Sequence, residues 1–317
     1  MTRSDPMLCD RLRAHLLAPR PAEVVCVGHT TWDMTWRVDA LPAGGGKQRA
    51  SGYRDGGGGM AATAAVAIAR LGGLARFWGR AGDDTAGVAM RTELAAAGVD
   101  VEGLRLAPGA RSSVSAILVE SGGERRIVNF RGDALPEDPG GMPLERIATA
   151  GAVLADPRWP AGAQTAFEAA RAAGVPTVLD GDVAERELID SLLAQADIVI
   201  FSEPGLAGYV PELSDPLAGL ARARDRGCRV AALTQGPAGV TWSDAGGITH
   251  LPAHSITALD TTGAGDVFHG AFALAVSAGL AVADAMAFAN AAAALKCQYR
   301  GTRDGCPDLR AVLEMLA

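Results

Sequence analysis

The chain alternates short apolar runs that end in a polar residue or glycine with longer segments of helical periodicity. The first run, 24–28, is rich in valine and ends in glycine, which is typical of a buried strand. Strands that alternate with helices predict an α/β fold: a mostly parallel central sheet with helices on both faces, and ligands at the carboxyl ends of the strands. Further strands are predicted at 75–79, 153–156, 177–180, 198–202 and 229–234, and helices at 60–71, 85–97, 161–173, about 184–195 and about 215–226.

Two segments, about 35–53 and about 111–131, depart from this alternation. The second is typical of a hairpin with its turn at 121–123. Arg125 and Asn129 lie four residues apart on its second strand and therefore share one face. We expect the two segments to form a small β-sheet lid on the α/β body. The alternative is that they are edge strands of the main sheet.

Length, composition and charge limit the kind of protein. The 317 residues, 49% of them apolar, can bury a large core in one or two domains. The net charge of −7 argues against nucleic acid or an anionic membrane as a partner. The five cysteines follow no metal-ligand or disulfide spacing, so we expect a reducing, cytoplasmic location. Residues 1–21 lack a secretory apolar region and are predicted to be an N-terminal extension, loosely attached or folded as a short helix, before a domain at 22–317.

The segment Asp260-Thr261-Thr262-Gly263-Ala264-Gly265-Asp266 joins a turn of small residues to an apolar helical run. Small residues let the backbone approach a ligand closely, and free N–H groups at a helix start attract an anion. Asp266 has the wrong charge to hold a phosphate, but it is placed to take a proton from a hydroxyl that attacks one. The segment therefore predicts phosphoryl transfer to an alcohol. The alternative is a helix capped by Thr262, with Asp266 interacting with the helix dipole.

A glycine run, 56–59, precedes the predicted helix at 60–71. The dinucleotide fingerprint Gly-x-Gly-x-x-Gly directly after a strand is absent, which argues against a dehydrogenase. The run is either a flexible turn or a platform for a substrate or anion. Taken alone, Asp33, after the first strand, is typical of a turn or cap residue.

Taken in order, these segments resemble the PfkB/ribokinase family of carbohydrate kinases over about residues 23–310. The resemblance implies a ribokinase-like fold and an enzyme that uses ATP and Mg²⁺ to phosphorylate a sugar hydroxyl. It implies that Asp266 is the general base and that Gly263, Ala264 and Gly265 form the anion hole. It also implies a sugar site at Asp33, Gly57, Gly58 and Gly59, a nucleotide site at Thr234, Gly236, Gly239 and Asn290, and a monovalent cation such as K⁺ at Asp260 and Thr262, next to the loop near Gly301.

The chain departs from the family pattern in two places. Met60 and Thr63 occupy positions where the family often has asparagine, which affects the sugar pocket. The stretch 202–205, Ser-Glu-Pro-Gly, lacks the final glutamate of the family's Asn-x-x-Glu motif, which helps to organise Mg²⁺ and phosphate. Neither change involves Asp266.

Three polar residues, Lys47, Asn129 and Arg158, lie where they could hold an anionic group at the far end of a sugar. Each alone could equally be a solvated surface residue. The segments around them, including 111–117 and 153–159, resemble the sulfofructose kinases of sulfoglycolysis, in which the matching residues bind the sulfonate. This resemblance implies phosphorylation of the C1 hydroxyl of 6-deoxy-6-sulfofructose.

Two other functions stay open from the sequence. One is a kinase of the same fold for fructose, ribose, a ketohexonate or fructose 6-phosphate. The other is a sugar- or nucleotide-binding regulator that has lost catalysis, against which the intact Asp266 argues. A lid with open strand edges favours a homodimer, because unpaired edge groups need partners.

Overall fold

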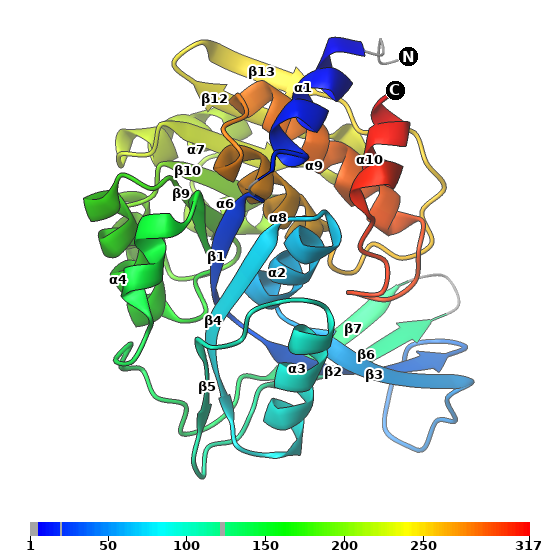
Figure 1. Cartoon of the computed structure of the whole chain (residues 1–317). Helices are drawn as coiled ribbons and strands as arrows, with labels where there is room; N and C mark the ends of the chain where they lie inside the picture. The colour runs from blue at the N-terminus through cyan, green and yellow to red at the C-terminus, as the bar shows by residue number, and fades with distance from the viewer. Residues whose placement is uncertain (1–5, 20, 121–123) are drawn as a thin grey trace.

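A nine-stranded sheet forms the centre of the computed structural model, which describes residues 6–19, 21–120 and 124–317 (Figure 1). The strand order is β13-β12-β11-β10-β9-β8-β1-β4-β5, and neighbours from β11 to β5 run parallel, whereas β12 and β13 are antiparallel. The strands are β1 (Glu23–Gly28), β4 (Leu74–Gly82), β5 (Leu104–Ala107), β8 (Ala152–Ala155), β9 (Thr177–Gly181), β10 (Ile198–Ser202), β11 (Val230–Thr234), β12 (Val240–Asp244) and β13 (Gly247–Leu251).

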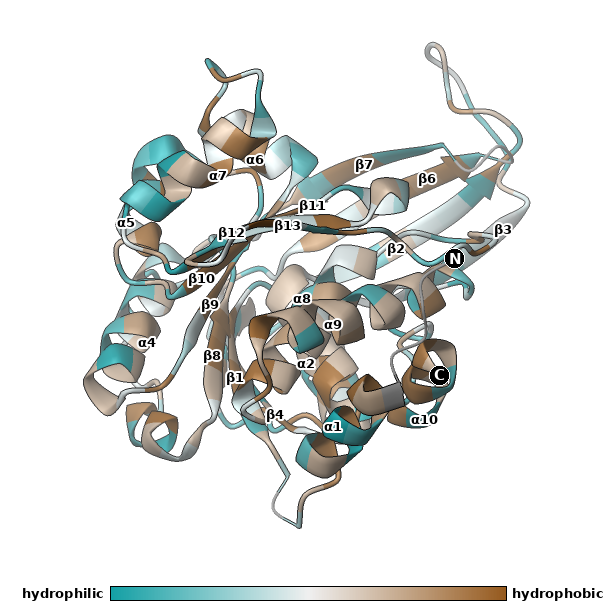
Figure 2. Ribbon diagram, turned by 90° about the horizontal axis from the view of Figure 1, so that it is seen from above, coloured by the Kyte–Doolittle hydropathy of each residue, from teal (hydrophilic) through white to brown (hydrophobic). Residues whose placement is uncertain are grey.

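Helices cover both faces of this sheet because its strands are apolar on both sides. In β1, Val24 and Cys26 face one core, whereas Val25 and Val27 face the other. Figure 2 shows the two helical layers on either side of the sheet. The first layer contains α1 (Pro6–Leu16), α2 (Met60–Arg70), α3 (Thr85–Ala96), α8 (Ala264–Ser277), α9 (Val282–Cys297) and α10 (Leu309–Leu316), and the second contains α4 (Pro160–Ala173), α5 (Arg186–Leu193), α6 (Glu203–Tyr209) and α7 (Pro216–Asp225).

A separate four-stranded sheet projects from this body, in the order β3-β2-β6-β7 (Figure 2). Its strands are β2 (Thr31–Val38), β3 (Gly52–Gly58), β6 (Val114–Glu120) and β7 (Arg125–Phe130). The predicted small second sheet is therefore confirmed, and its strands are not edge strands of the main sheet. We call this sheet the lid. The hairpin turn predicted at 121–123 lies outside the described residues.

The N-terminal segment is attached more firmly than the sequence suggested. The predicted short helix is present as α1, and Leu8, Leu12 and Leu16 are buried in the core. Arg11 also forms an ion pair with Asp284 on α9, at 2.7 Å. Loose attachment was therefore the wrong alternative, because the apolar face of this helix packs on the body.

Other differences concern short elements. Residues 56–58 belong to β3 and pair with 31–33 of β2, so they are not a flexible turn. The hairpin of β12 and β13 and the short α6 were not predicted from the sequence. In the part of the chain that the structure describes, no helix combines the length and apolar character needed to cross a bilayer.

Candidate active site

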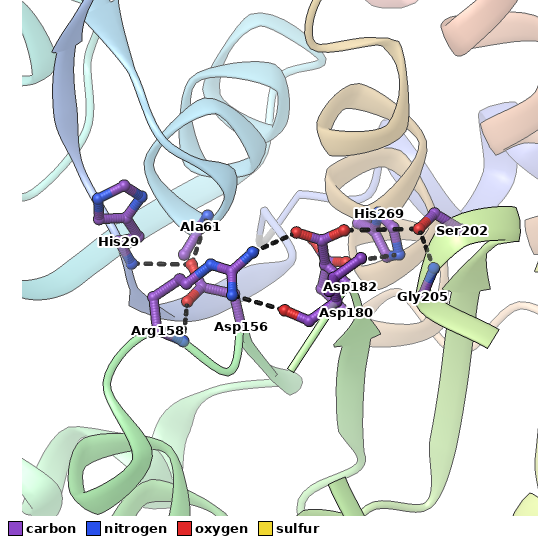
Figure 3. Close-up of polar contacts among 10 residues, drawn as sticks. His29, Ala61, Asp156, Arg158, Asp180, Asp182, Ser202, Gly205 and His269 are labelled. Carbon is purple, nitrogen blue, oxygen red and sulfur yellow. Dashed lines mark hydrogen bonds and ion pairs between the residues drawn. The ribbon is translucent and has the colours of Figure 1, made fainter. Parts of the chain in front are cut away.

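One buried carboxylate holds together three chain segments at the carboxyl edge of the sheet. Asp156, directly after β8, accepts hydrogen bonds from the backbone N–H groups of His29 (2.8 Å), Ala61 (3.1 Å) and Arg158 (2.8 Å) (Figure 3). These groups belong to the end of β1, the start of α2 and the turn after β8. Gly28 makes room for the carboxylate, since a Cβ there would lie 2.4 Å from it. The site is therefore assembled on a fixed frame.

The predicted anion hole lies at the start of α8. Gly263 has a left-handed backbone (φ 78°) that turns the chain into the helix. The N–H of Ala264 donates to the carbonyl of Thr261 at 3.2 Å, whereas those of Gly265 and Asp266 have no partner among the described hydrogen bonds. A Cβ on Gly265 would meet no atom within 4 Å, so a ligand can approach the backbone there. The N–H groups of Gly265 and Asp266 are thus free for an anion, whereas that of Ala264 is already bonded within the turn.

Asp266 lies on the first turn of α8, beside these N–H groups. Burial, with a further contribution from the nearby Asp180 carboxylate, raises the pKa of Asp266 to about 8, against a partly compensating effect of His269. A carboxylate with a pKa close to neutral is a better proton acceptor than an ordinary aspartate. The electrostatics of the site therefore favour Asp266 as a general base.

His269 lies one turn further along α8 and links this helix to the sheet. Its Nδ1 is 2.7 Å from the carbonyl oxygen of Gly265, and its Nε2 is 3.1 Å from that of Ile200. The Nε2 also lies 3.5 Å from the Asp180 carboxylate (Figure 3). Since both carbonyls only accept hydrogen bonds, a ring that is protonated on both nitrogens satisfies both contacts. Burial, together with Asp182 and Asp156, raises the pKa of Asp180 well above its ordinary value.

The predicted sugar-binding residues Asp33, Gly57 and Gly58 lie together where the lid joins the body. A Cβ on Gly58 would lie 2.0 Å from the Asp33 carboxylate, so only glycine leaves this carboxylate in place. Burial raises the pKa of Asp33, whereas a hydrogen bond with Ser115 and the charge of Arg303 oppose the rise. Gly59, with φ 93°, passes so close to the His29 backbone that a side chain would collide with it.

Two functional candidates at this site, Arg303 and Glu93, were missed from the sequence. Arg303 is buried and donates to the Gly58 carbonyl (2.7 Å) and to Glu93 (3.2 Å). Glu93 in turn accepts the N–H of Gly57 at 2.7 Å. Arg303 thus holds the end of β3 in place, directly at Gly58 and through Glu93 at Gly57. Its only sequence signal is its place in the turn-rich tail after α9, near Gly301.

The three residues predicted to hold an anion have different surroundings. The Asn129 amide donates to Ser113 (3.3 Å), and Ser113 contacts the His29 ring (3.0 Å), which connects Asn129 to the Asp156 frame. Arg158 donates to Asp182 (2.6 Å) and to the carbonyl of Val183 (2.6 Å) (Figure 3). Lys47 is exposed in the loop between β2 and β3.

Arg158 lines a cavity of about 600 Å³ together with His29, Arg80 and Arg131. Burial lowers the pKa of His29, the charge of Asp156 opposes this, and the three guanidinium groups lower it further. Arg80 is paired with Glu137 (2.6 Å), and Arg158 with Asp182. Arg131 is exposed, and no ion pair is described for it. The cavity also borders Asp133 and Glu185, so its net charge is moderate.

The predicted nucleotide residues lie around the end of β11. Thr234 ends this strand and donates to the Phe201 carbonyl at 3.2 Å. Gly236 begins a short 3₁₀ turn and Gly239 directly follows it, both with positive φ (50° and 99°). Asn290 on α9 is buried and donates to the Pro252 carbonyl at 2.9 Å, so it is neither a surface nor a capping residue.

Steric crowding explains the glycine at position 205, where the family's magnesium motif has glutamate. Ser202 caps α6 by accepting the N–H of Gly205 at 3.0 Å. A Cβ on Gly205 would lie 2.0 Å from the Gly181 carbonyl oxygen, so the helix start packs too closely on β9 for a glutamate. Asp180 and Asp182 at the end of β9 supply carboxylate oxygens to the same region instead.

The fold and the site have the features expected of an enzyme of phosphoryl transfer: free N–H groups at a helix start, the Asp266 carboxyl of raised pKa beside them, and the Asp33 carboxylate where the lid joins the body. The chain belongs to the pfkB family of carbohydrate kinases, whose family model matches residues 21–309. It is therefore an ATP-dependent carbohydrate kinase.

Individual relatives differ in their sugars. The chain is 31% identical to an ATP-dependent ribose-1-phosphate kinase of Halopiger xanaduensis, over 93% of this chain and 98% of the relative. It is 34% identical to a fructokinase of Klebsiella pneumoniae, over 73% and 78% of the two chains. A solved structure of a putative ribokinase from Agrobacterium tumefaciens is similar with a TM-score of 0.89 and 38% identity, over 93% of this chain and 97% of that one.

Proposed function

We propose that this kinase transfers the γ-phosphoryl group of ATP to the C1 hydroxyl of 6-deoxy-6-sulfofructose. The observation that carries the proposal is the arginine-lined cavity at Arg158, which shares the Asp156 frame with the rest of the site. Arg80 and Arg158 are each paired with a carboxylate, which leaves Arg131 as the cation with no described ion pair. The carboxylates of Asp133 and Glu185 also line the cavity, so its guanidinium donors bring no large excess of positive charge, which suits a monoanion such as a sulfonate better than a phosphate dianion.

In this mechanism the chain positions and deprotonates the acceptor hydroxyl. Asp33 accepts hydrogen bonds from sugar hydroxyls beside Gly57 and Gly58, while Arg131 and Arg158, together with Asn129 and Lys47, hold the anionic end. Asp266 then takes the C1 proton, and the N–H groups of Gly265 and Asp266 stabilise negative charge on the transferred group. Closure of the lid excludes water, which competes as an acceptor.

The nucleotide binds along Thr234, Gly236 and Gly239, with Asn290 close to the base. The residues that would hold Mg²⁺ here are Asp180 and Asp182, because carboxylates together with substrate phosphates are its usual oxygen ligands. When bound, Mg²⁺ neutralises charge on the phosphates. Gly205 leaves no space for the family's glutamate, so these carboxylates take its place.

Release of ADP with a panel of acceptors tests the proposal. The panel contains sulfofructose, fructose, fructose 6-phosphate, ribose and ribose 1-phosphate. We expect the highest kcat/KM with sulfofructose, and Arg158→Ala should raise KM for sulfofructose at least tenfold while it changes KM for fructose little. A preference for an uncharged sugar, or an equal effect of Arg158→Ala on both sugars, would refute the sulfonate assignment.

The second candidate substrate is a sugar phosphate, favoured by the 31% identity to a ribose-1-phosphate kinase. Preference for ribose 1-phosphate or fructose 6-phosphate in the same panel would establish it.

We further propose a homodimer formed through the lid. Its edges are β3 and β7, and all side chains of β7 are exposed. Light scattering after size-exclusion chromatography distinguishes a 32.4 kDa monomer from a dimer of twice that mass.

A further inference from the structure

A lysine is completely buried next to the turn that leads into the anion hole. Lys296, in the last turn of α9, has no solvent-accessible surface, and its Nζ donates to the Asp260 carbonyl at 2.8 Å. The chain contains 29 lysines and arginines, of which only Lys47 and Lys296 are lysines. Burial of a charged group is costly unless it is paired: burial lowers the pKa of Lys296, and the charge of Asp260 opposes this.

The surroundings of Asp260 leave little room for an additional cation. Its Oδ1 accepts the N–H of Thr262 (2.9 Å), and its Oδ2 accepts that of Gly301 (3.0 Å) and lies 3.5 Å from the Arg54 guanidinium. The N–H groups keep the pKa of Asp260 low despite burial, so the carboxylate stays ionised. The carboxylate that would bind a metal ion is thus already occupied by hydrogen-bond donors.

Nearby cations oppose a further positive charge. The guanidinium of Arg125, on the lid, donates to Thr261 (3.3 Å) and to Thr262 (3.0 Å). Arg37, Arg54, Arg125 and Arg300 line a cavity of about 430 Å³ over this turn, and Asp260 is the one carboxylate among the described residues that line it. Coulomb repulsion from these groups disfavours an alkali ion at the same place. A monovalent metal ion at Asp260 and Thr262, implied by the family resemblance, therefore does not fit the residues present.

We propose that the ε-ammonium of Lys296 replaces the monovalent metal ion, so that the enzyme works without K⁺. The ammonium fixes the Asp260 carbonyl, the Asp260 carboxylate fixes the Thr262 N–H, and the Thr261 carbonyl accepts the Ala264 N–H. Lys296 is thus a positioning residue: it contacts Asp260, which lies four residues before Ala264 at the start of the anion hole. The proposal depends on the kinase activity of the family and not on the identity of the sugar.

The first test uses the unmodified enzyme with the best acceptor of the panel. ADP release is measured in Na⁺, K⁺ and tetramethylammonium buffers of equal ionic strength, and the melting temperature is measured in the same buffers. We expect turnover to agree within about twofold and K⁺ to leave the melting temperature unchanged. Activation by K⁺ of more than fivefold, or a specific rise in melting temperature with K⁺, would overturn the proposal.

The second test uses substitutions of Lys296 that should make the enzyme dependent on an added monovalent cation. Lys296→Ala removes the ammonium and leaves space for an ion, and Lys296→Met keeps an apolar stem that fills it. We expect both to lower kcat at least tenfold with little change in KM for the sugar, and NH₄⁺ or K⁺ to restore part of the activity of Lys296→Ala only. Arg310→Met, at an exposed position on α10, is the control for loss of one positive charge.

The results of this second test decide between a cation and a purely structural side chain. A folded Lys296→Ala enzyme with unchanged activity, or with a loss that no monovalent cation restores, would refute the proposal. If both variants fail to fold, the cation independence of the unmodified enzyme decides the question. If no sugar of the panel is turned over, the melting temperatures in K⁺ and Na⁺ decide it.

Discussion

Replacement of Asp266 by asparagine should separate the chemistry of the site from its stability. The variant has the same shape but cannot accept a proton, and general-base catalysis contributes roughly 10²- to 10⁴-fold. We therefore expect kcat to fall by about this factor, while the Kd for the sugar, measured by calorimetry, changes less than threefold. Asparagine keeps the size of the side chain and one oxygen that accepts hydrogen bonds, so a large loss of sugar affinity is not expected.

The same substitution should stabilise the protein at neutral and alkaline pH. The folded-state pKa of Asp266, about 8, lies above the ordinary aspartate value of 3.8, so ionisation destabilises the fold progressively as the pH rises between these values. At pH 7 the difference corresponds to at most about 4 kcal/mol, and partial exposure of the side chain reduces our expectation to about 2 kcal/mol. Asparagine has no such cost. The melting temperature of Asp266→Asn should exceed that of the wild type by a few degrees at pH 8, and the gap should close towards pH 4.

Two measurements would refute this reasoning. Turnover of Asp266→Asn within tenfold of the wild type would show that another group takes the proton. A melting temperature that is lower than that of the wild type at pH 8 would show that the Asp266 carboxylate is not destabilised by its surroundings.

Three further predictions follow from the site. In the wild type, kcat/KM should rise with pH and level off above about pH 8, because Asp266 must lose its proton to act as a base; a flat profile between pH 6 and 9 contradicts this. Arg303→Met should raise KM for the sugar about tenfold or more through loss of support for the Gly58 carbonyl, and unchanged KM would show that this support is not needed. Gly205→Ala should lower the melting temperature by several degrees, since its Cβ would press on the Gly181 carbonyl; an unchanged melting temperature would mean that α6 can shift at no cost.

The sequence predicted the fold well wherever a local pattern carried the information. The alternation of apolar strands with helices predicted the parallel sheet, and the break in this alternation predicted the lid. The β12–β13 hairpin was missed although the alternation of Val240, Trp242 and their polar neighbours is visible, because the glycine turn before it was interpreted by itself. The short α6 begins with a proline and has too few residues for a clear helical period.

The sequence predicted only those site residues that belong to contiguous motifs. Asp266 and the glycines near it were found because they are contiguous. Arg303 and Lys296 were missed because their roles arise from tertiary contacts: Arg303 meets Glu93 across 210 residues of sequence, and Lys296 meets Asp260 across 36. In the sequence, Lys296 is an ordinary basic residue at a helix end. Only the structure shows that its charge is buried.

The direct connection of β1 to β2 has a consequence for the specificity of ATP use. Two residues, His29 and Thr30, separate the body strand from the lid strand, and Asp33 lies three residues beyond them. A sugar bound at Asp33, as proposed, would contact the lid next to its hinge, whereas the residues proposed for the nucleotide lie at β11 and on α9, outside the lid. Futile hydrolysis of ATP should stay slow until an acceptor is present. An acceptor that lacks the hydroxyls gripped by Asp33 should uncouple the enzyme, with more ADP released than sugar phosphorylated.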